Sequence, residues 1–201
     1  MQVEKRMIKD LITVKPETSL EEAIEILRKN SIRHLPVVKE EKFFGLVTEG
    51  DIRKALFSPF LKELTVSDIM IKNPITITPE TSLEEAAILI YSYKIGGLPV
   101  LKDKKLVGII TVTDILFAFI EIMGILKSSS RIDLAIEKGM KNFEKAVNLI
   151  KKAGGEIISV SMGGELKEKK KIYYFRLMKC DPDKIAKELE KNGFNVLSII
   201  K

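Results

Sequence analysis

The stretch Pro16-Glu17-Thr18-Ser19-Leu20-Glu21-Glu22-Ala23 occurs a second time in the chain, residue for residue, at positions 79–86. The offset of 63 residues continues without a gap on both sides and aligns Leu35-Pro36-Val37 with Leu98-Pro99-Val100. About 24 of about 50 paired positions are identical. Self-similarity at a fixed period indicates a repeat architecture. We therefore expect two copies of one unit, residues 1–63 and 64–126.

Each copy has the pattern of a short extended segment, a helix, two strands and a second helix. Thr18-Ser19 followed by Glu21-Glu22 is a helix-capping pattern, and apolar residues continue at helical spacing through Leu27. In the first turn of a helix the paired glutamates favour the dipole, so we do not interpret them as catalytic carboxylates. Residues 35–38 and 43–47 are β-rich runs around a polar turn. One copy is too small to bury its apolar helix faces, so the copies should pack as a pseudo-twofold pair.

The composition excludes several kinds of site. The 201 residues contain one His, one Cys and no Trp, which rules out a His-rich metal site, a Cys-x-x-Cys centre and an internal disulfide. No catalytic acid–base pair is evident, so we expect a protein that is not an enzyme. The N-terminus has no apolar signal segment, and the longest apolar stretch, residues 115–126, is too short to span a membrane. We expect a cytoplasmic protein without membrane contact.

Three sequence elements carry a resemblance to a known family. They are Asp68-Ile69-Met70, the segment 32–38, and Gly-hydrophobic-x-Thr-x-x-Asp, which begins at Gly45 and again at Gly108. In this order they resemble a tandem pair of CBS domains, a regulatory module that binds adenine nucleotides. The resemblance implies that residues 1–126 form such a pair. It also implies AMP, ADP, ATP or S-adenosylmethionine as the regulatory ligand, and the residues do not choose among these four.

The motifs Thr48-x-x-Asp51 and Thr111-x-x-Asp114 stand where a strand ends and a helix begins. Thr-x-x-Asp is itself a helix-capping pattern, and these residues can serve as caps alone. The same geometry suits a nucleotide, because a helix N-terminus attracts phosphate and a carboxylate one turn on can accept ribose hydroxyls. The two interpretations are compatible, and the CBS resemblance favours a nucleoside site.

In the CBS family, a cleft combines the Thr/Asp motif of one copy with the early strand and the pre-Leu-Pro segment of the other. The resemblance implies a first cleft made of Ile12, Ile32, Arg33, His34, Pro36, Thr111, Thr113 and Asp114. It implies a second cleft made of Thr48, Asp51, Ile75, Ile95, Gly96, Gly97 and Pro99.

The two clefts should differ in charge. Arg33 and His34 can meet phosphate oxygens by charge-assisted hydrogen bonds, whereas Gly96 and Gly97 offer only backbone and space. Glu49 lies inside the Thr-x-x-Asp motif of the second cleft and would repel a phosphate if it faced inward. We therefore expect the first cleft to bind the more anionic ligand.

Residues 127–201 contain no third copy of the repeat. Their pattern predicts strands at 131–136, 157–162, 172–178 and 194–200, with helices at 142–153 and from Asp181-Pro182 to Asn192-Gly193. This βαββαβ order is a split-βαβ, ferredoxin-like sandwich that resembles an ACT domain, a family that binds amino acids or mediates dimerisation. The fold class is then α+β, and the chain resembles the acetoin-utilisation accessory proteins, which combine these parts in this order.

One departure from the ACT pattern affects the expected role of this region. ACT domains that bind amino acids usually carry an Asp and a Pro-Gly in the first strand–helix loop, where this chain has Glu137-Lys138-Gly139-Met140. We expect a structural or dimerising role instead, and hence a homodimer.

Our leading hypothesis is a non-catalytic sensor that transmits ligand occupancy to the ACT-like region or to a partner. An oligomerising regulatory subunit of a partner enzyme, with a structural ligand, is the alternative. A third hypothesis, nucleic-acid binding through Lys167, Lys169, Lys170 and Lys171, is weaker because a solvated hairpin tip explains these lysines. The charge is nevertheless uneven. Residues 1–126 carry 17 basic and 18 acidic side chains, whereas residues 127–201 carry 17 and 10, which accounts for the net charge of +6.

Overall fold

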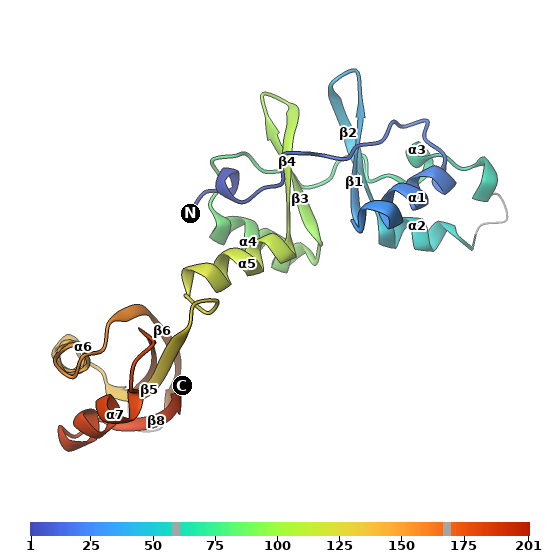
Figure 1. Ribbon diagram of the computed structural model, residues 1–201. Helices are drawn as coiled ribbons and strands as arrows, with labels where there is room; N and C mark the ends of the chain where they lie inside the picture. The colour runs from blue at the N-terminus through green and yellow to red at the C-terminus, as the bar shows by residue number, and fades with distance from the viewer. Residues whose placement is uncertain (58–60, 167–169) are drawn as a thin grey trace. The chain divides into compact units, whose positions relative to one another are not determined.

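The computed structural model describes residues 1–57, 61–166 and 170–201 and contains two compact units, Met1–Leu116 and Phe117–Lys201 (Figure 1). Two of the hairpin lysines, Lys167 and Lys169, lie outside the described residues. Within the described ranges, every helix is too short or too polar to cross a lipid bilayer.

The two repeats occupy the first unit, except that the last helix of the second repeat continues past Leu116, and they have the same order of elements. The first repeat comprises α1 (Leu20–Asn30), β1 (His34–Lys39), β2 (Lys42–Thr48) and α2 (Glu49–Ala55). The second comprises α4 (Leu83–Tyr93), β3 (Gly97–Lys102), β4 (Lys105–Thr111) and α5 (Val112–Ile122). Short helical turns precede or join them: η1 (Val3–Lys5), η2 (Leu61–Glu63) and α3 (Val66–Ile69). This order confirms the predicted succession of helix, two strands and helix in each copy.

The predicted helix caps are present. The hydroxyl of Ser19 accepts a hydrogen bond from the amide of Glu22, and Ser82 accepts one from Glu85. Both helices end on a residue with a left-handed backbone, Ser31 in the first repeat and Lys94 in the second. The glutamates of the first turn therefore occupy helix N-termini, as their spacing predicts.

Each repeat contributes an antiparallel hairpin, with His34 opposite Thr48 and Gly97 opposite Thr111. The extended segment that precedes each first helix forms an isolated parallel bridge instead of a full strand. In the first repeat Val14 bridges to Val37, where the amide of Val14 donates to the carbonyl of Pro36. Pro36 and its counterpart Pro99 thus act as backbone acceptors within the sheet edge.

The two repeats exchange their leading segments. Residues 1–8 pack on the second repeat, where the amide of Val3 donates to the carbonyl of Thr81 and Ile8 bridges to Ile109. Residues 64–71 pack on the first repeat, where the amide of Val66 donates to the carbonyl of Thr18. In Figure 1 the first turn of the chain lies beside the second repeat, and α3 lies beside the first.

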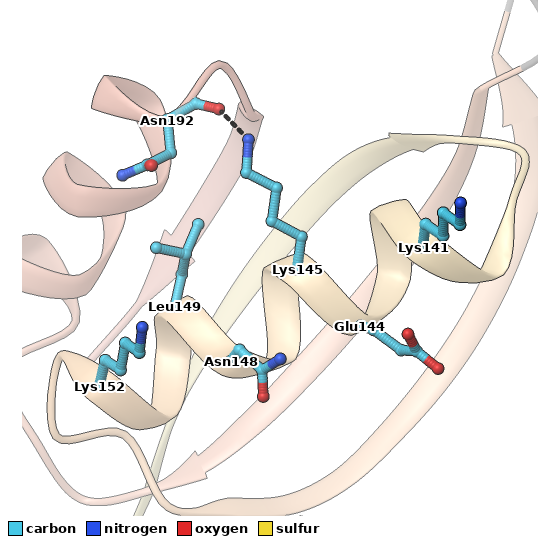
Figure 2. A pocket seen from close by; sticks show the side chains of 7 residues that line it. All are labelled: Lys141, Glu144, Lys145, Asn148, Leu149, Lys152 and Asn192. Atoms are coloured by element: carbon cyan, nitrogen blue, oxygen red, sulfur yellow. Dashed lines mark hydrogen bonds between the residues drawn. The ribbon is translucent and has the colours of Figure 1, made fainter.

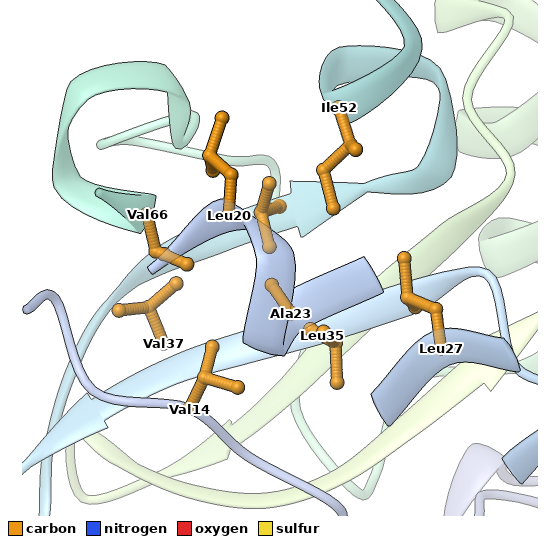
Figure 3. Packing of buried hydrophobic residues seen from close by; sticks show 9 residues of the cluster. Val14, Leu20, Ala23, Leu27, Leu35, Val37, Ile52 and Val66 are labelled. Atoms are coloured by element: carbon orange, nitrogen blue, oxygen red, sulfur yellow. The ribbon is translucent and has the colours of Figure 1, made fainter. Parts of the chain in front are cut away.

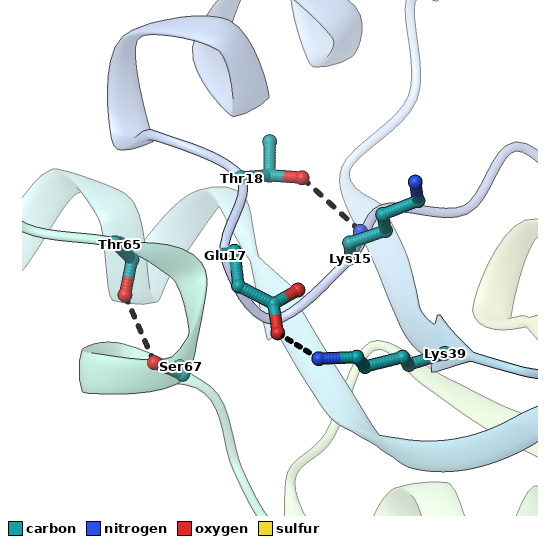
Figure 4. Close-up of polar contacts among 6 residues, drawn as sticks. All are labelled: Lys15, Glu17, Thr18, Lys39, Thr65 and Ser67. Carbon is teal, nitrogen blue, oxygen red and sulfur yellow. Dashed lines mark hydrogen bonds and ion pairs between the residues drawn. The ribbon is translucent and has the colours of Figure 1, made fainter.

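The contact between the exchanged segment 64–71 and the first repeat is both polar and apolar. Figure 4 shows Thr65 and Ser67 of this segment near the turn before α1, where Lys39 is paired with Glu17. The amide of Ser67 donates to the carbonyl of Pro16. Val66 itself is fully buried and joins the core of the first repeat. Figure 3 shows this core, whose labelled residues are Val14, Leu20, Ala23, Leu27, Leu35, Val37, Ile52 and Val66.

The second unit has the element order βαββαβ that the sequence predicts. The elements are β5 (Ser129–Glu137), α6 (Met140–Lys152), β6 (Ile157–Leu166), β7 (Lys170–Met178), α7 (Pro182–Lys191) and β8 (Asn195–Ile200). They build a four-stranded sheet of order β6-β7-β5-β8, with antiparallel pairing between all neighbours. The observed β6 and β7 extend further toward their connecting hairpin than the predicted runs 157–162 and 172–178.

The two faces of this sheet differ in polarity. Ile132, Leu134 and Ile136 of β5 alternate onto one face, where they pack with residues of α6 and α7 such as Ile150 and Ile185. Side chains at alternate positions of a strand point to opposite faces. Arg131 and Asp133 of β5 therefore lie on the face away from these helices.

Candidate functional site

The first unit has a cavity of about 650 Å³ at the junction of its two repeats. Both repeats supply the same two kinds of segment, the residues before Leu-Pro and the strand-to-helix turn with the Thr-x-x-Asp motif. The lining residues are Ile8, Ser31, Ile32, Arg33, His34, Thr48, Glu49, Gly50, Gly96, Ile109, Thr111, Val112 and Thr113. The junction of the repeats is therefore the place where the chemically useful motifs of the sequence meet.

The backbone holds these segments in equivalent positions in the two repeats. The amide of Glu49 donates to the carbonyl of Arg33 over 3.0 Å, and the amide of Val112 donates to that of Gly96 over 3.1 Å. Each bond joins the first residue of a helix, α2 or α5, to the segment before the Leu-Pro pair. The helix N-termini are thereby fixed against the cavity wall.

Both Thr-x-x-Asp motifs form caps inside this site. The hydroxyl of Thr48 donates to Oδ2 of Asp51 over 2.6 Å, and the Asp51 amide returns a bond to that hydroxyl. In the second repeat the hydroxyl and the amide of Thr111 both donate to Oδ2 of Asp114. The capping interpretation of these motifs is confirmed, and in both cases Oδ2 is the oxygen that accepts the Thr hydroxyl.

A third Thr-x-x-Asp sequence shows what the motif does without a cavity. Thr65 caps α3 through Asp68, whose Oδ2 accepts bonds from the amide and the hydroxyl of Thr65. Neither residue lines the cavity between the repeats. The motif alone is therefore a cap, and the surroundings distinguish the two motifs at the repeat junction.

The first repeat supplies the charged groups of the cavity. Burial lowers the pKa of His34 below its ordinary value, the charge of Arg33 acts in the same direction, and Asp51 opposes both. His34 is therefore neutral near pH 7, when it can donate one ring N–H. Glu49 lines the cavity and pairs with Arg53 at 2.8 Å, one helical turn on. This ion pair reduces the repulsion that Glu49 would exert on an anion.

A second cavity, of about 660 Å³, adjoins the first along the helices of the first repeat. The two cavities share Ser31, Ile32, Arg33 and Glu49. The second cavity is also lined by Arg28, Arg53 and apolar side chains of the first repeat. At the offset of 63 residues, these three arginines correspond to Tyr91, Gly96 and Leu116 in the second repeat. The two repeats thus have the same order of backbone elements but carry different charges at these positions.

The structure brings together residues that the sequence assigns to two separate clefts. From the first set, Ile32, Arg33, His34, Thr111 and Thr113 line the cavity at the junction, and from the second set Thr48 and Gly96 do so. The remaining residues of the two sets are not on its wall: Ile12, Pro36, Asp51, Ile75, Ile95, Gly97, Pro99 and Asp114. Asp51 and Asp114 are hydrogen-bonded to Thr48 and Thr111, which line it.

Several lining residues are absent from the sequence-based sets. Gly50 and Val112 lie within the Thr-x-x-Asp motifs, and Ser31 directly precedes Ile32. Their places in or beside these motifs are the sequence signal that indicates them. Ile8 is different, because it reaches the cavity only through the exchange of the leading segments. No local pattern around Ile8 indicates that position.

The second unit has a basic cavity of about 440 Å³ beside α6, shown in Figure 2. Lys141, Lys145 and Lys152 line it together with Glu144. Lys145 donates to the carbonyl of Asn192 at the end of α7, and its ammonium lies 5.6 Å from the ring centroid of Phe194. A lysine that bonds the last carbonyls of a helix stabilises that helix. Lys145 therefore has a structural role, because it binds the end of α7.

Comparison with known proteins identifies the family to which the two repeats belong. Residues 2–58 and 66–121, more than half of the chain, match the CBS domain family. The chain therefore belongs to the CBS domain family and carries two CBS domains in tandem. The match ends at residue 121 and does not extend to the βαββαβ region.

The relatives include both stand-alone CBS proteins and parts of enzymes. A CBS domain-containing protein of Dictyostelium discoideum is 38% identical over 134 residues, which cover 60% of this chain and 92% of that protein. The inosine-5'-monophosphate dehydrogenase of Korarchaeum cryptofilum is 40% identical over 112 residues, or 55% of this chain. That match covers only 23% of the enzyme, so the similarity concerns its CBS region.

Solved structures resemble the chain over the same region. A CBS domain pair in complex with 5'-methylthioadenosine and S-adenosyl-L-methionine is 38% identical, with a TM-score of 0.55, and covers 59% of this chain and 95% of that one. CBSX2 in complex with AMP is 31% identical, with a TM-score of 0.56 over 60% and 97% of the two chains. A structure described as an acetoin utilization protein from Vibrio cholerae is 30% identical, with a TM-score of 0.57 over 62% and 94%.

Proposed function

We propose that this chain is a non-catalytic regulatory protein that binds an adenine nucleotide or another adenosyl ligand where its two CBS domains meet. The observation that carries the proposal is the convergence of both Thr-x-x-Asp turns and the Arg33-His34 segment on one cavity. Its volume of about 650 Å³ lies within the range of small-molecule sites. Similar CBS pairs have been solved with AMP and with S-adenosyl-L-methionine, which supports this ligand class.

We assign the ligand contacts by chemistry. Oδ1 of Asp114 has no hydrogen-bond partner among the described residues, and we assign it as the acceptor of a ribose hydroxyl while Oδ2 keeps the cap. Arg33 and His34 offer donors to phosphate oxygens, and the N-terminus of α5 adds its amides. We keep the expected first set for this more anionic ligand: Ile12, Ile32, Arg33, His34, Pro36, Thr111, Thr113 and Asp114.

The second set would serve a less charged adenosyl ligand or a weaker site. It comprises Thr48, Asp51, Ile75, Ile95, Gly96, Gly97 and Pro99. Oδ1 of Asp51 lies 3.9 Å from the ammonium of Lys54, so this carboxylate has a competing cation that Asp114 lacks among the described ion pairs. We therefore propose that binding here is weaker.

We propose that residues 127–201 form an ACT-like, ferredoxin-like domain after CBS repeats at 1–63 and 64–126. The strand order β6-β7-β5-β8 and the antiparallel pairing support this assignment. Gly139 is the N-cap of α6 with a backbone φ of 140°, a conformation that favours glycine. Since the loop lacks the usual Asp and Pro, we propose a dimerising role for this domain and a homodimeric protein.

The chain offers a direct route by which occupancy could reach this domain. Val112 and Thr113 line the cavity and are the first residues of α5, and the chain continues from α5 into the second unit. A ligand that binds one arrangement of the α5 N-terminus better than another shifts the population of that arrangement. The alternative function, a regulatory subunit of a partner enzyme with a structural ligand, is supported by the CBS regions of enzymes such as inosine-5'-monophosphate dehydrogenase.

Calorimetry with AMP, ADP, ATP and S-adenosylmethionine tests the proposal. We expect wild type to bind at least one of the four, and Asp114→Ala to weaken the tightest of them by about tenfold or more. Asp51→Ala should have the smaller effect. Asp68→Ala is the matched control, because it removes the same cap at a position away from the cavity. The proposal is wrong if no adenosine compound binds, or if Asp68→Ala weakens binding as much as Asp114→Ala.

A further inference from the structure

Two arginines lie side by side on the face of the C-terminal sheet that points away from α6 and α7. Arg131 of β5 is directly opposite Arg176 of β7 in the antiparallel register. Like charges directly opposite each other destabilise a sheet unless other groups compensate them. This arrangement therefore requires negative charge on the same face.

Asp133 supplies negative charge on this face, and Arg131 donates hydrogen bonds to both of its carboxylate oxygens. The Nε and Nη2 atoms of Arg131 lie 2.7 and 2.8 Å from Oδ1 and Oδ2 of Asp133. The Asp133 side chain is only 9% exposed. A bidentate pair of this kind satisfies both charges, and among the described ion pairs Asp133 is paired with Arg131 and not with Arg176.

The hydrogen-bond partner that the described residues offer Arg176 is neutral. Nη1 of Arg176 donates to the hydroxyl of Ser129 over 2.8 Å, and no carboxylate of the described residues forms an ion pair with this arginine. The side chain is half-buried, so water screens its charge less than it would at an open surface. Among the described residues, no carboxylate therefore compensates the charge of Arg176 on this partly covered face.

A cavity of about 440 Å³ opens next to Arg176. Ser159, Ser161 and Tyr174 line it from β6 and β7, and Met123 and Met162 complete its lining. Ser159 donates to the carbonyl of Met123, which fixes that part of the lining and leaves Ser161 and Tyr174 as hydroxyl donors.

The tyrosine is held in place on two sides. The guanidinium carbon of Arg131 lies 4.6 Å from the centroid of the Tyr174 ring. On the other side, a methyl group added to Gly163 would come within 2.5 Å of the Tyr174 hydroxyl oxygen. The ring therefore lies against the bare backbone of β6, and its hydroxyl is positioned before any ligand binds.

We propose that this cavity binds a small organic monocarboxylate with a compact aliphatic body. The carboxylate would pair with Arg176 and accept hydrogen bonds from Ser161 and Tyr174, while the aliphatic part contacts Met123 and Met162. The two arginines and Asp133 leave one net positive charge, which suits a monoanion better than a phosphate dianion. The site is separate from the cavity between the CBS domains and does not depend on the adenosyl ligand.

Methionine methyl groups allow a test in the full chain. The protein has seven methionines, of which Met123 and Met162 line this cavity and Met7 and Met70 belong to the exchanged segments of the first unit. We would label the methyl groups with carbon-13 and titrate with isovalerate, and separately with inorganic phosphate. We expect saturable shifts of the Met123 and Met162 signals with isovalerate, unchanged Met7 and Met70 signals, and weaker binding of phosphate.

Three variants test whether Arg176 and the fixed Tyr174 ring bind the carboxylate. Arg176→Gln should weaken isovalerate binding by at least about tenfold, because a charge-assisted bond is lost. Lys179→Gln is the matched control, since it removes one positive charge from an exposed position after the same strand and should leave binding unchanged. Gly163→Ala, which displaces the Tyr174 ring, should also weaken binding. The proposal is overturned if isovalerate shifts neither cavity methionine, if phosphate binds more tightly, or if Arg176→Gln binds like wild type with its methyl spectrum otherwise intact.

Discussion

The ring of His34 lies directly against the backbone of Gly96, so that a methyl group on Gly96 would be 2.7 Å from Nε2. The only histidine of the chain thus joins the first CBS domain to the second at the cavity wall. A side chain in either position changes the shape of the cavity and the contact between the domains together.

Gly96→Ala should therefore destabilise the first unit and weaken adenosyl binding. Placing a methyl group in a closely packed contact costs about 1–3 kcal/mol. Urea unfolding of the variant measures the loss of stability, and calorimetry measures the loss of binding. Gly164→Ala is the control, because no heavy atom lies within 4 Å of the added methyl group. Equal stability of Gly96→Ala and wild type would contradict the observed contact.

Arg33 should discriminate between ligands by charge. Arg33→Gln is expected to weaken AMP binding by about tenfold and to leave 5'-methylthioadenosine binding within about twofold, because only AMP carries a phosphate. Lys29→Gln removes a similar charge from an exposed position of α1 outside the cavity between the domains and should affect neither ligand. If both ligands weaken equally, Arg33 holds the fold of the cavity instead of the phosphate.

The lowered pKa of His34 makes stability depend on pH. In the folded chain the neutral ring is favoured, whereas in the unfolded chain the ring titrates near its ordinary value of 6.5. The unfolded state therefore takes up a proton first as the pH falls, and the free energy of unfolding decreases below about pH 6.5. Urea unfolding between about pH 7.5 and 5.5 should show a smaller decrease for His34→Gln than for wild type. A decrease of equal size in both proteins would contradict this assignment.

The exchanged segments should contribute equally to the two domains. Val3 and Val66 are both fully buried, 63 residues apart. We expect Val3→Ala and Val66→Ala each to cost about 2 kcal/mol of unfolding free energy, since each leaves a cavity in a core. Val160→Ala, at a side chain that is 37% exposed, is the control and should cost much less. An effect near zero for Val3→Ala would mean that residues 1–8 do not hold this position in solution.

The sequence predicts most of the local structure because the signals are local. Ser19 and Glu22 are three residues apart and form their cap wherever α1 lies. The same holds for Asp181, which caps α7 before Pro182. The βαββαβ order of the second unit follows from alternation and helical spacing within short windows.

The sequence predicts the site less completely, because the site depends on contacts between distant residues. The repeat locates both Thr-x-x-Asp turns, but it does not show that Thr48 and Thr111 line one cavity. The position of Ile8 follows from a bridge to Ile109, about a hundred residues later. The pair of arginines at 131 and 176 depends on strand register, which the separate strand patterns leave open.

The exchange of leading segments also has a consequence for how the first unit melts. Each CBS domain obtains part of its core from the other half of the sequence, so neither half is complete when it is cut at residue 63. Loss of one domain exposes the binding place of a segment that the other domain supplies. We therefore expect the two domains to unfold in a single cooperative transition, and expect separately produced halves to associate with each other or with a second copy of themselves.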